Sequence, residues 1–210
     1  GALHSGHLSL VHKSNSKCDL TIVSIYVNPA QFTPGEDLSN YPRDLEKDLE
    51  ALSKFQVDVV FFPDDKQMYP QGFSTFILED NFSHRLEGKS RPEHFKGVLT
   101  IVGKLFNIIR PSHAFFGEKD AQQIRVLQKM VTDLNYNLQI VPCPIVREAN
   151  GLAMSSRNIY LSENNREKAG VIHRSLKKAE EMLVQGYHSV VEIREVVIAM
   201  IKTEKQIRLD

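Results

Sequence analysis

The sequence lacks tryptophan and has only two cysteines among its 210 residues. Cys18 and Cys143 lie far apart and show no metal-binding spacing, so we expect reduced, buried thiols. The sequence also lacks an excess of either charge, because 26 Lys and Arg balance 26 Asp and Glu. This balance gives no bulk electrostatic reason for a nucleic-acid partner, although a local basic site for a small anion stays open.

Long apolar runs are missing as well. No stretch approaches the roughly 20 apolar residues that span a bilayer, and the first residues do not resemble a signal peptide. We therefore expect a cytoplasmic protein with no membrane partner. The chain opens without Met, directly on a Gly/His loop, so we expect further residues in front of it.

Strand-like and helix-like segments alternate along the first two thirds of the chain. This alternation predicts an α/β fold with a Rossmann-like parallel sheet and helices on both faces. In such sheets, ligands lie beyond the carboxyl ends of the strands. The expected strands are 20–27, 57–62, 73–78, 113–116 and 138–141, and the expected helices are 6–17, 42–54, 97–109 and 121–134.

The opening loop contains two histidines, His4 and His7, at the start of a predicted helix. Residues three apart lie on one helix face, Gly6 allows a ligand close to the backbone, and a helix start favours phosphate. Imidazoles placed there can donate hydrogen bonds to a phosphate whose charge grows in a transition state. Two surface histidines, or half of a metal site, are the alternatives for this motif alone.

Two later loops also carry side chains suited to phosphate. Lys119, within 117–120, could hold a phosphate as a point charge, whereas Asp120 could simply cap the next helix. The segment 155–157 offers two hydroxyls and a guanidinium to a triphosphate. A polar helix cap is the alternative for that segment.

Uncharged amides follow the first predicted strand. Asn28 and Gln31 could bind the hydroxyls and carboxylate of a small polar substrate, or they could belong to a satisfied turn. Gln122 and Gln123 open a later helix, where they could simply be solvated. Arg91 lies in a stretch with several basic-type residues, for which a mobile surface loop is the alternative.

Taken together and in this order, the three phosphate-type loops resemble the nucleotidyltransferase superfamily. Within it, the match is much closer to the pantothenate synthetase (pantoate–β-alanine ligase) family. The resemblance runs from Gly1 to about Leu161. It is carried by the segments 3–7, 24–32, 41–43, 68–70, 86–88, 91–92, 94–95, 104–107, 116–123 and 151–158.

The resemblance implies an enzyme that condenses pantoate with β-alanine to give pantothenate, AMP and pyrophosphate. It implies ATP as substrate, Mg²⁺ as cofactor, a pantoyl-adenylate intermediate, a homodimer and no protein metal site. His7 would be the proton donor, and His4, Lys119, Ser155, Ser156 and Arg157 would complete the catalytic set. The implied ATP-binding residues are Gly1, Ala2, Leu3, His4, Ser5, Gly6, His7, Gly117, Glu118, Lys119, Asp120, Val146, Met154, Ser155, Ser156 and Arg157. The implied pantoate-binding residues are Gln31, Gln123, Asn28 and Arg91, with Gln31 also binding β-alanine.

The chain departs from the family pattern in places. The family has a strand and a Pro-Thr-Met segment before the opening loop, and its C-terminal domain continues beyond Asp210. Ser5 stands where an acidic residue is common, and Glu93 stands where a small one is usual. We expect residues 1–145 to form the nucleotide- and pantoate-binding domain and 146–210 to begin a smaller, truncated C-terminal domain.

Two other functions share parts of this pattern. An adenylyltransferase acting on a phosphorylated cofactor precursor would have the same His-x-Gly-His loop, but it would not require Gln31 and Gln123. A nucleotide-binding module without turnover would not need the complete set of His, Lys, Ser and Arg side chains.

Overall fold

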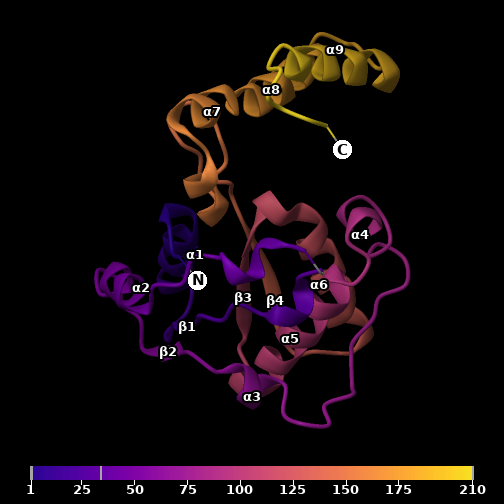
Figure 1. Ribbon diagram of the computed structural model, residues 1–210. Helices are drawn as coiled ribbons and strands as arrows, with labels where there is room; N and C mark the ends of the chain where they lie inside the picture. The colour runs from indigo at the N-terminus through magenta and orange to yellow at the C-terminus, as the bar shows by residue number, and fades with distance from the viewer. Residues whose placement is uncertain (1, 34, 210) are drawn as a thin grey trace. The chain divides into compact units, whose positions relative to one another are not determined.

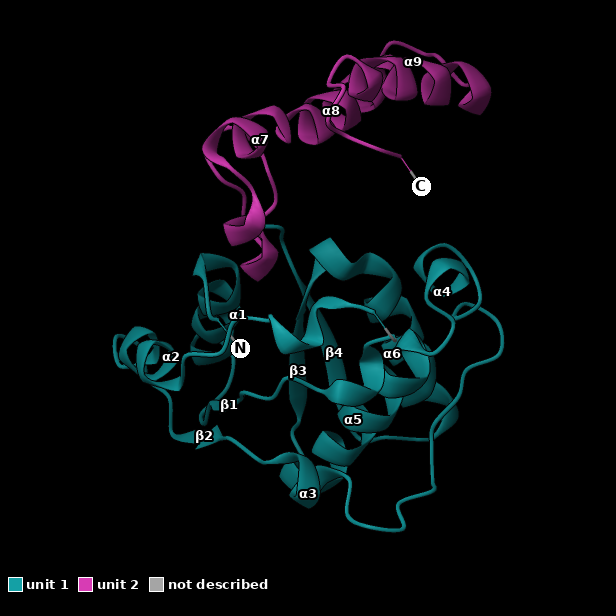
Figure 2. Ribbon diagram, viewed as in Figure 1, with its two compact units in different colours: residues 1–145 teal, residues 146–210 magenta. Residues whose placement is uncertain are grey.

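The computed structural model describes residues 2–33 and 35–209, so Gly1 of the expected ATP site lies outside the described residues. The chain has a mixed α/β fold, in which short parallel strands alternate with helices (Figure 1). It divides into two compact units, residues 1–145 and residues 146–210 (Figure 2).

The first unit contains all four strands of the described residues and most of the helices. Its α-helices are α1 (Ser5–Asn15), α2 (Leu45–Leu52), α3 (Asp65–Met68), α4 (Glu87–Ser90), α5 (His94–Ile109) and α6 (Ala121–Asp133). Its strands are β1 (Ile22–Ser24), β2 (Val59–Phe61), β3 (His113–Gly117) and β4 (Gln139–Cys143). Short 3-10 turns are η1 (Pro29–Gln31), η2 (Asp37–Ser39) and η3 (Glu118–Asp120).

The strands form two parallel pairs rather than one continuous sheet. In the first pair Val23 of β1 lies opposite Val60 of β2, and in the second Phe115 of β3 lies opposite Val141 of β4. Within residues 2–33 and 35–209, no ladder joins β1 to β3. A cavity of about 690 Å³ is lined by both strands together with α1 and α5. The parallel pairing follows the prediction, whereas the single sheet is not formed by the described strands.

The expected strand at 73–78 is wrong. No strand is assigned there, and the main-chain N–H of Ile77 donates to Thr100 Oγ1 of α5 at 3.0 Å. This segment therefore satisfies its backbone against a helix instead of a neighbouring strand.

The core of the first unit is centred on α5, which is nearly enclosed. Leu99 and Leu127 are 0% exposed and Phe95 is 1% exposed. Burial of one such side chain stabilises the fold by roughly 1.5–3 kcal/mol. Tyr26 and Tyr69 pack against the rim of the same cluster. The helix that carries this core therefore also holds the segments that follow β1 and α3.

Helix boundaries differ from the sequence expectation where a polar cap decides them. Helix α2 begins at Leu45 rather than at Pro42, because Asp44 Oδ1 accepts a hydrogen bond from the Lys47 N–H at 3.1 Å. Such a side-chain cap satisfies a helix N–H that has no partner within the helix. Helix α5 begins at His94, three residues before the expected start.

The second unit is helical, as the sequence predicts beyond Ser162. Its elements are η4 (Ser156–Tyr160), α7 (Glu163–Lys168), α8 (Val171–Val184) and α9 (Val190–Lys202), and α8 packs against α9. One isolated antiparallel bridge joins Arg147 to Ala153.

Both cysteines are free, and Cys143 is buried as predicted. Cys18 is only partly buried, because it lies just past the end of α1. No helix in the described part of the chain is long and apolar enough to cross a membrane.

Candidate active site

His4 and His7 form the cap at the start of α1. The His4 Nδ1 accepts a hydrogen bond from the Gly6 N–H at 3.1 Å, and His7 Nδ1 accepts one from the His4 N–H at 3.4 Å. The two imidazoles thus play the parts of the two side chains in a capping box. Because each Nδ1 accepts, each neutral ring carries its proton on Nε2. The pair therefore offers two N–H donors from rings whose centroids lie 4.0 Å apart.

The electrostatics of the pair favour these neutral forms. Burial lowers the pKa of His7 to about 4, with further lowering by the neighbouring His4 and by Lys119, while Asp120 opposes the change. Burial and Lys119 also lower the pKa of His4. Both rings are thus uncharged donors near pH 7. Lys119 follows β3, the strand against which α1 packs, and its positive charge contributes to the lowering of both pKa values.

We expect the stability of the free protein to fall as the pH drops from about 6.5 to about 4. In this window the unfolded chain binds a proton at residue 7, whereas the folded chain, with a His7 pKa of about 4, does not. Replacing His7 with Gln keeps an acceptor for the cap but removes this titration. Urea unfolding at pH 7.5 and pH 5 should therefore show a smaller loss for the variant. An equal loss in both proteins would contradict the lowered pKa.

Lys119 lies in η3, directly after β3. Its Nζ contacts Asp120 Oδ1 at 3.1 Å. Asp120 occupies the N-cap position of α6 but makes no capping hydrogen bond with its side chain. The cap expected as the alternative role of Asp120 is therefore not formed. Gly117 ends β3, and a Cβ added there would meet no atom within 4 Å.

Asn28 and Gln31 lie together in and beside η1, just past β1. Asn28 is only 2% exposed, and its Nδ2 donates to Gln31 Oε1 at 3.4 Å. Its Oδ1 caps η1 by accepting from the Ala30 N–H. The alternative that the sequence allowed, a turn whose polar side chains bond within the protein, is thus present. The same turn also positions the Gln31 amide.

Arg91 braces the turn that carries Gln31. Its guanidinium contacts Glu36 twice, with Nε–Oε1 at 2.5 Å and Nη2–Oε2 at 3.0 Å, and Glu87 Oε1 at 2.7 Å. It also donates to the Gln31 carbonyl at 3.3 Å, and His94 Nδ1 lies 2.9 Å from the same oxygen. Arg91 is therefore held by protein partners on three segments.

The two glutamines of α6 differ in their surroundings. Gln122 Nε2 donates to the carbonyls of Phe82 and Arg85, and its Oε1 accepts from the Glu87 N–H. It anchors the loop before α4, a role that the sequence pattern did not reveal. Gln123 is half-buried in the first turn of α6, and its side chain makes no hydrogen bond to another described residue.

In the second unit, the Val146 carbonyl accepts from the Met154 N–H at 2.9 Å. Ser155 Oγ caps η4 by accepting from the Arg157 N–H at 3.3 Å, so the polar cap allowed by the sequence is present. Glu148 holds this loop through Asn158 and through two contacts with Arg166, and these partners lower the pKa of Glu148. The sequence pattern gave no signal for this anchor.

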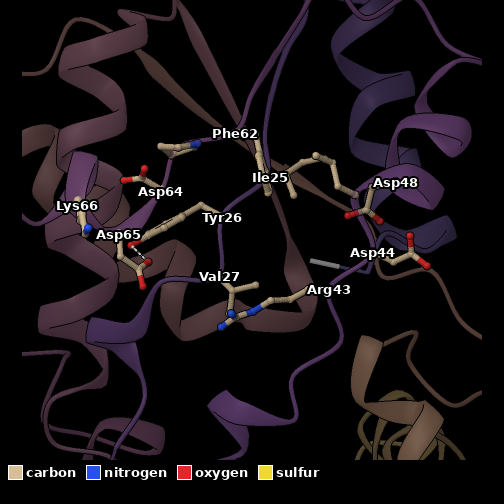
Figure 3. Close-up of a pocket in the computed structure, with 12 residues that line it drawn as sticks. Ile25, Tyr26, Val27, Arg43, Asp44, Asp48, Phe62, Asp64, Asp65 and Lys66 are labelled. Atoms are coloured by element: carbon tan, nitrogen blue, oxygen red, sulfur yellow. Dashed lines mark hydrogen bonds between the residues drawn. The ribbon is translucent and has the colours of Figure 1, made fainter.

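A separate cavity of about 640 Å³ follows the carboxyl ends of β1 and β2 (Figure 3). The Tyr26 hydroxyl donates to Asp65 Oδ1 at 2.9 Å on one side of this cavity, while Arg43 and Asp48 line the other. Burial and Asp65 raise the pKa of Tyr26. The cavity lining contains none of the expected substrate-binding residues.

The comparison with known proteins decides what this arrangement belongs to. A family model described as pantoate-beta-alanine ligase matches residues 1–210. The chain belongs to the pantoate–β-alanine ligase family. Membership makes it a ligase of pantothenate biosynthesis.

Similar members of the pantoate–β-alanine ligase family agree over the whole chain. The pantothenate synthetase of Acetivibrio thermocellus is 53% identical over 210 residues, and the alignment covers 100% of this chain and 75% of that protein. The crystal structure of pantothenate synthetase from Thermus thermophilus superposes with a TM-score of 0.97 at 43% identity, covering 100% of this chain and 76% of that one. The chain thus spans about three quarters of these relatives.

A second pantoate–β-alanine ligase structure carries ligands. The enzyme of Francisella tularensis, described as complexed with beta-gamma ATP and beta-alanine, has a TM-score of 0.81 and 40% identity, and it covers 95% of this chain and 75% of that chain.

Proposed function

We propose that the protein condenses pantoate with β-alanine in two steps that consume ATP. The observation that carries this proposal is the pair of neutral imidazole donors, His4 and His7, on a helix that packs against β3, the strand that leads to Lys119. Two N–H donors and one cation suit a polyphosphate whose charge shifts during reaction. The ATP and β-alanine complex of the Francisella tularensis relative supports both ligands.

In the first step a pantoate carboxylate oxygen attacks the α-phosphorus of ATP. The bond to the β-phosphate bridging oxygen breaks, and pyrophosphate leaves with its electron pair. His4, His7 and Lys119 would stabilise the growing phosphate charge. The family resemblance assigns a phosphate-binding role to Ser155, Ser156 and Arg157 as well. Catalysis would come mainly from positioning and electrostatics, which are strong where water is excluded.

In the second step the β-alanine amine attacks the acyl carbon of pantoyl adenylate. An amide bond forms, the acyl–phosphate bond breaks, and AMP leaves with that electron pair while the amine loses a proton. Gln31 and Gln123 would bind pantoate, with Asn28 holding Gln31 from behind, and Gln31 would also contact β-alanine. Arg91 would act in the same site by holding the Gln31 turn.

In enzymes that use ATP, Mg²⁺ binds mainly to the substrate phosphates and has few protein ligands. We therefore place it on ATP, where it would neutralise phosphate charge. The family resemblance also supports a cytoplasmic homodimer. Ala2, Leu3, Ser5, Gly6, Glu118, Asp120, Val146 and Met154 would line the nucleotide.

The deciding experiment is ATP–pyrophosphate exchange measured with and without pantoate. We expect exchange only when pantoate is present, and AMP plus pantothenate only when β-alanine is added. Exchange driven by a phosphorylated acceptor, with none from pantoate, would instead identify an adenylyltransferase. Binding of ATP without AMP formation would identify a module without turnover.

Replacing Gly117 with Ala should weaken ATP use without weakening the fold. The backbone φ of −76° suits any residue, and the added Cβ would meet no protein atom within 4 Å. The free energy of unfolding should therefore stay level or rise by up to about 1 kcal/mol. The KM for ATP should rise roughly 10-fold, as for the loss of about 1.4 kcal/mol of binding. Ser112→Ala, just before β3, is the control, and an unchanged ATP KM would remove Gly117 from the nucleotide site.

A further inference from the structure

The side-chain amide of Asn28 has only one possible orientation. Its Nδ2 donates to the Gly97 carbonyl at 3.1 Å, and its Oδ1 accepts from the Ala30 N–H at 3.3 Å. A carbonyl cannot donate and an amide N–H cannot accept, so a flipped Asn28 would face two like groups. With 2% of its surface exposed, Asn28 has almost no access to solvent that could replace these partners.

This fixed amide determines how Gln31 is oriented. Asn28 Nδ2 also points at Gln31 Oε1, at a distance of 3.4 Å. The Gln31 oxygen is therefore used inside the protein, whereas Gln31 Nε2 donates no hydrogen bond to a described residue. The main chain of Gln31 is held as well, through the contacts of its carbonyl with Arg91 and His94. Gln31 thus keeps its NH₂ group available to a ligand, while its oxygen already accepts one hydrogen bond from Asn28.

Tyr69 completes this chain from the end of α3. Its hydroxyl donates to Asn28 Oδ1 at 2.7 Å, the shortest contact that Asn28 makes. Burial raises the pKa of Tyr69 to about 12, so the hydroxyl stays protonated and remains a donor. Its ring is fixed edge-on by Phe73 at 5.1 Å, and the Lys104 ammonium lies 5.3 Å from its centroid.

We propose that Tyr69 is a positioning residue that acts through Asn28 to aim the Gln31 NH₂ group at the acid substrate. This inference rests on the proposed function and names the chemistry that Gln31 selects. A ligand at this position must offer acceptors, such as carboxylate or hydroxyl oxygens. A ligand that presents an N–H donor to Gln31 would have to share the oxygen that already accepts from Asn28.

Replacing Tyr69 with Phe tests this role, with Tyr136→Phe as the matched control. Tyr136 packs against the same core cluster, but its hydroxyl makes no hydrogen bond to a described residue. We expect Tyr69→Phe to raise the KM for pantoate about 5- to 10-fold, as for one weakened hydrogen bond. The KM for ATP should stay within about twofold, since Gln31 is placed on the acid. Equal changes in both KM values, or no difference from Tyr136→Phe, would overturn the inference.

Gln31→Glu tests the direction of the amide. The new carboxylate can still accept from Asn28 Nδ2, so the turn keeps its contact, but it presents an acceptor to an acid. We expect kcat/KM for pantoate to fall about 100-fold, because the new carboxylate and the pantoate carboxylate are both acceptors and repel each other. A variant with wild-type use of pantoate would overturn the assignment.

A nuclear magnetic resonance readout separates this inference from the proposed function. In ¹⁵N-labelled protein without substrates, Tyr69→Phe should shift the side-chain NH₂ signals of both Asn28 and Gln31, identified by their loss in Asn28→Ala and Gln31→Ala. Tyr136→Phe should leave them in place. If the wild type forms no AMP with pantoate, the proposed function fails, but these shifts still decide the relay. Unmoved Gln31 signals would overturn it.

Discussion

Replacing His7 with Ala is expected to lower the rate of adenylate formation by about 100-fold or more, as for the loss of a donor to a transition-state oxygen. The neutral His7 ring carries its proton on Nε2, because Nδ1 accepts from the His4 main chain. The variant loses this donor and one part of the helix cap. Single-turnover formation of pantoyl adenylate with saturating ATP would measure the effect.

Two controls separate chemistry from stability in this experiment. His12→Ala removes an exposed imidazole from the same helix and should leave the rate unchanged. The missing cap in His7→Ala costs roughly 1 kcal/mol of stability, which thermal unfolding measures separately. A near-normal rate in His7→Ala, or an equal loss in His12→Ala, would show that His7 is not a donor to the transition state.

Lys119→Ala should produce a rate loss of the same order and one additional change. Because Lys119 contributes to the low pKa of His7 and His4, its removal should raise both pKa values. Titration of the two imidazoles in the free protein would detect that rise. Unchanged pKa values would mean that Lys119 is too far from the histidines to share a phosphate with them.

Replacing Gly97 with Ala should reduce pantoate use as strongly as Gln31→Glu does. A Cβ at Gly97 would lie 2.2 Å from the Ala30 carbonyl oxygen and 2.6 Å from the Gln31 nitrogen. Both are main-chain atoms, so η1 must move away from α5. We expect kcat/KM for pantoate to fall roughly 100-fold, in line with the cost of misplacing a substrate-binding group by about 1 Å.

Gly103→Ala is the matched control on the same helix. Its Cβ would meet the Ile77 Cδ1 at 2.5 Å, which is the tip of a side chain that can rotate. Overpacking of that kind costs about 1–3 kcal/mol of stability without moving η1. Similar pantoate kinetics in the two variants would show that the Gly97 contact does not position Gln31.

The sequence alone predicts those parts of the fold for which a single residue pattern is strong. Alternating patterns predicted the parallel α/β fold, and the helical character beyond Ser162 is confirmed. Segment 73–78 was predicted wrongly because a tertiary partner decides it, and residues 42–44 because a local side-chain cap starts the helix later. Thr100 takes up the Ile77 N–H, and Asp44 moves the start of α2.

Parts of the candidate site depend on contacts that no sequence spacing reveals. Gln122 anchors a loop some 35 residues away, and Tyr69 reaches Asn28 across a separation of 41 residues. A pattern of local residue types could suggest that Asn28 and Gln31 bind a polar ligand. It could not show that Asn28 is enclosed or that Arg91 is held by two carboxylates, since both follow from packing.

In the histidine cap on α1, the Nδ1 of each ring accepts from the helix main chain, while Nε2 of the same ring is available to a ligand. Within one imidazole, donation from Nε2 to an anion pushes electron density toward Nδ1, so the acceptor facing the main chain becomes stronger. A phosphate bound by His4 and His7 would tighten the hydrogen bonds that hold the amides of Gly6 and His4. The first turn of this helix would therefore be more rigid with nucleotide than without it, and the slowing of amide hydrogen exchange there would report occupancy without any turnover.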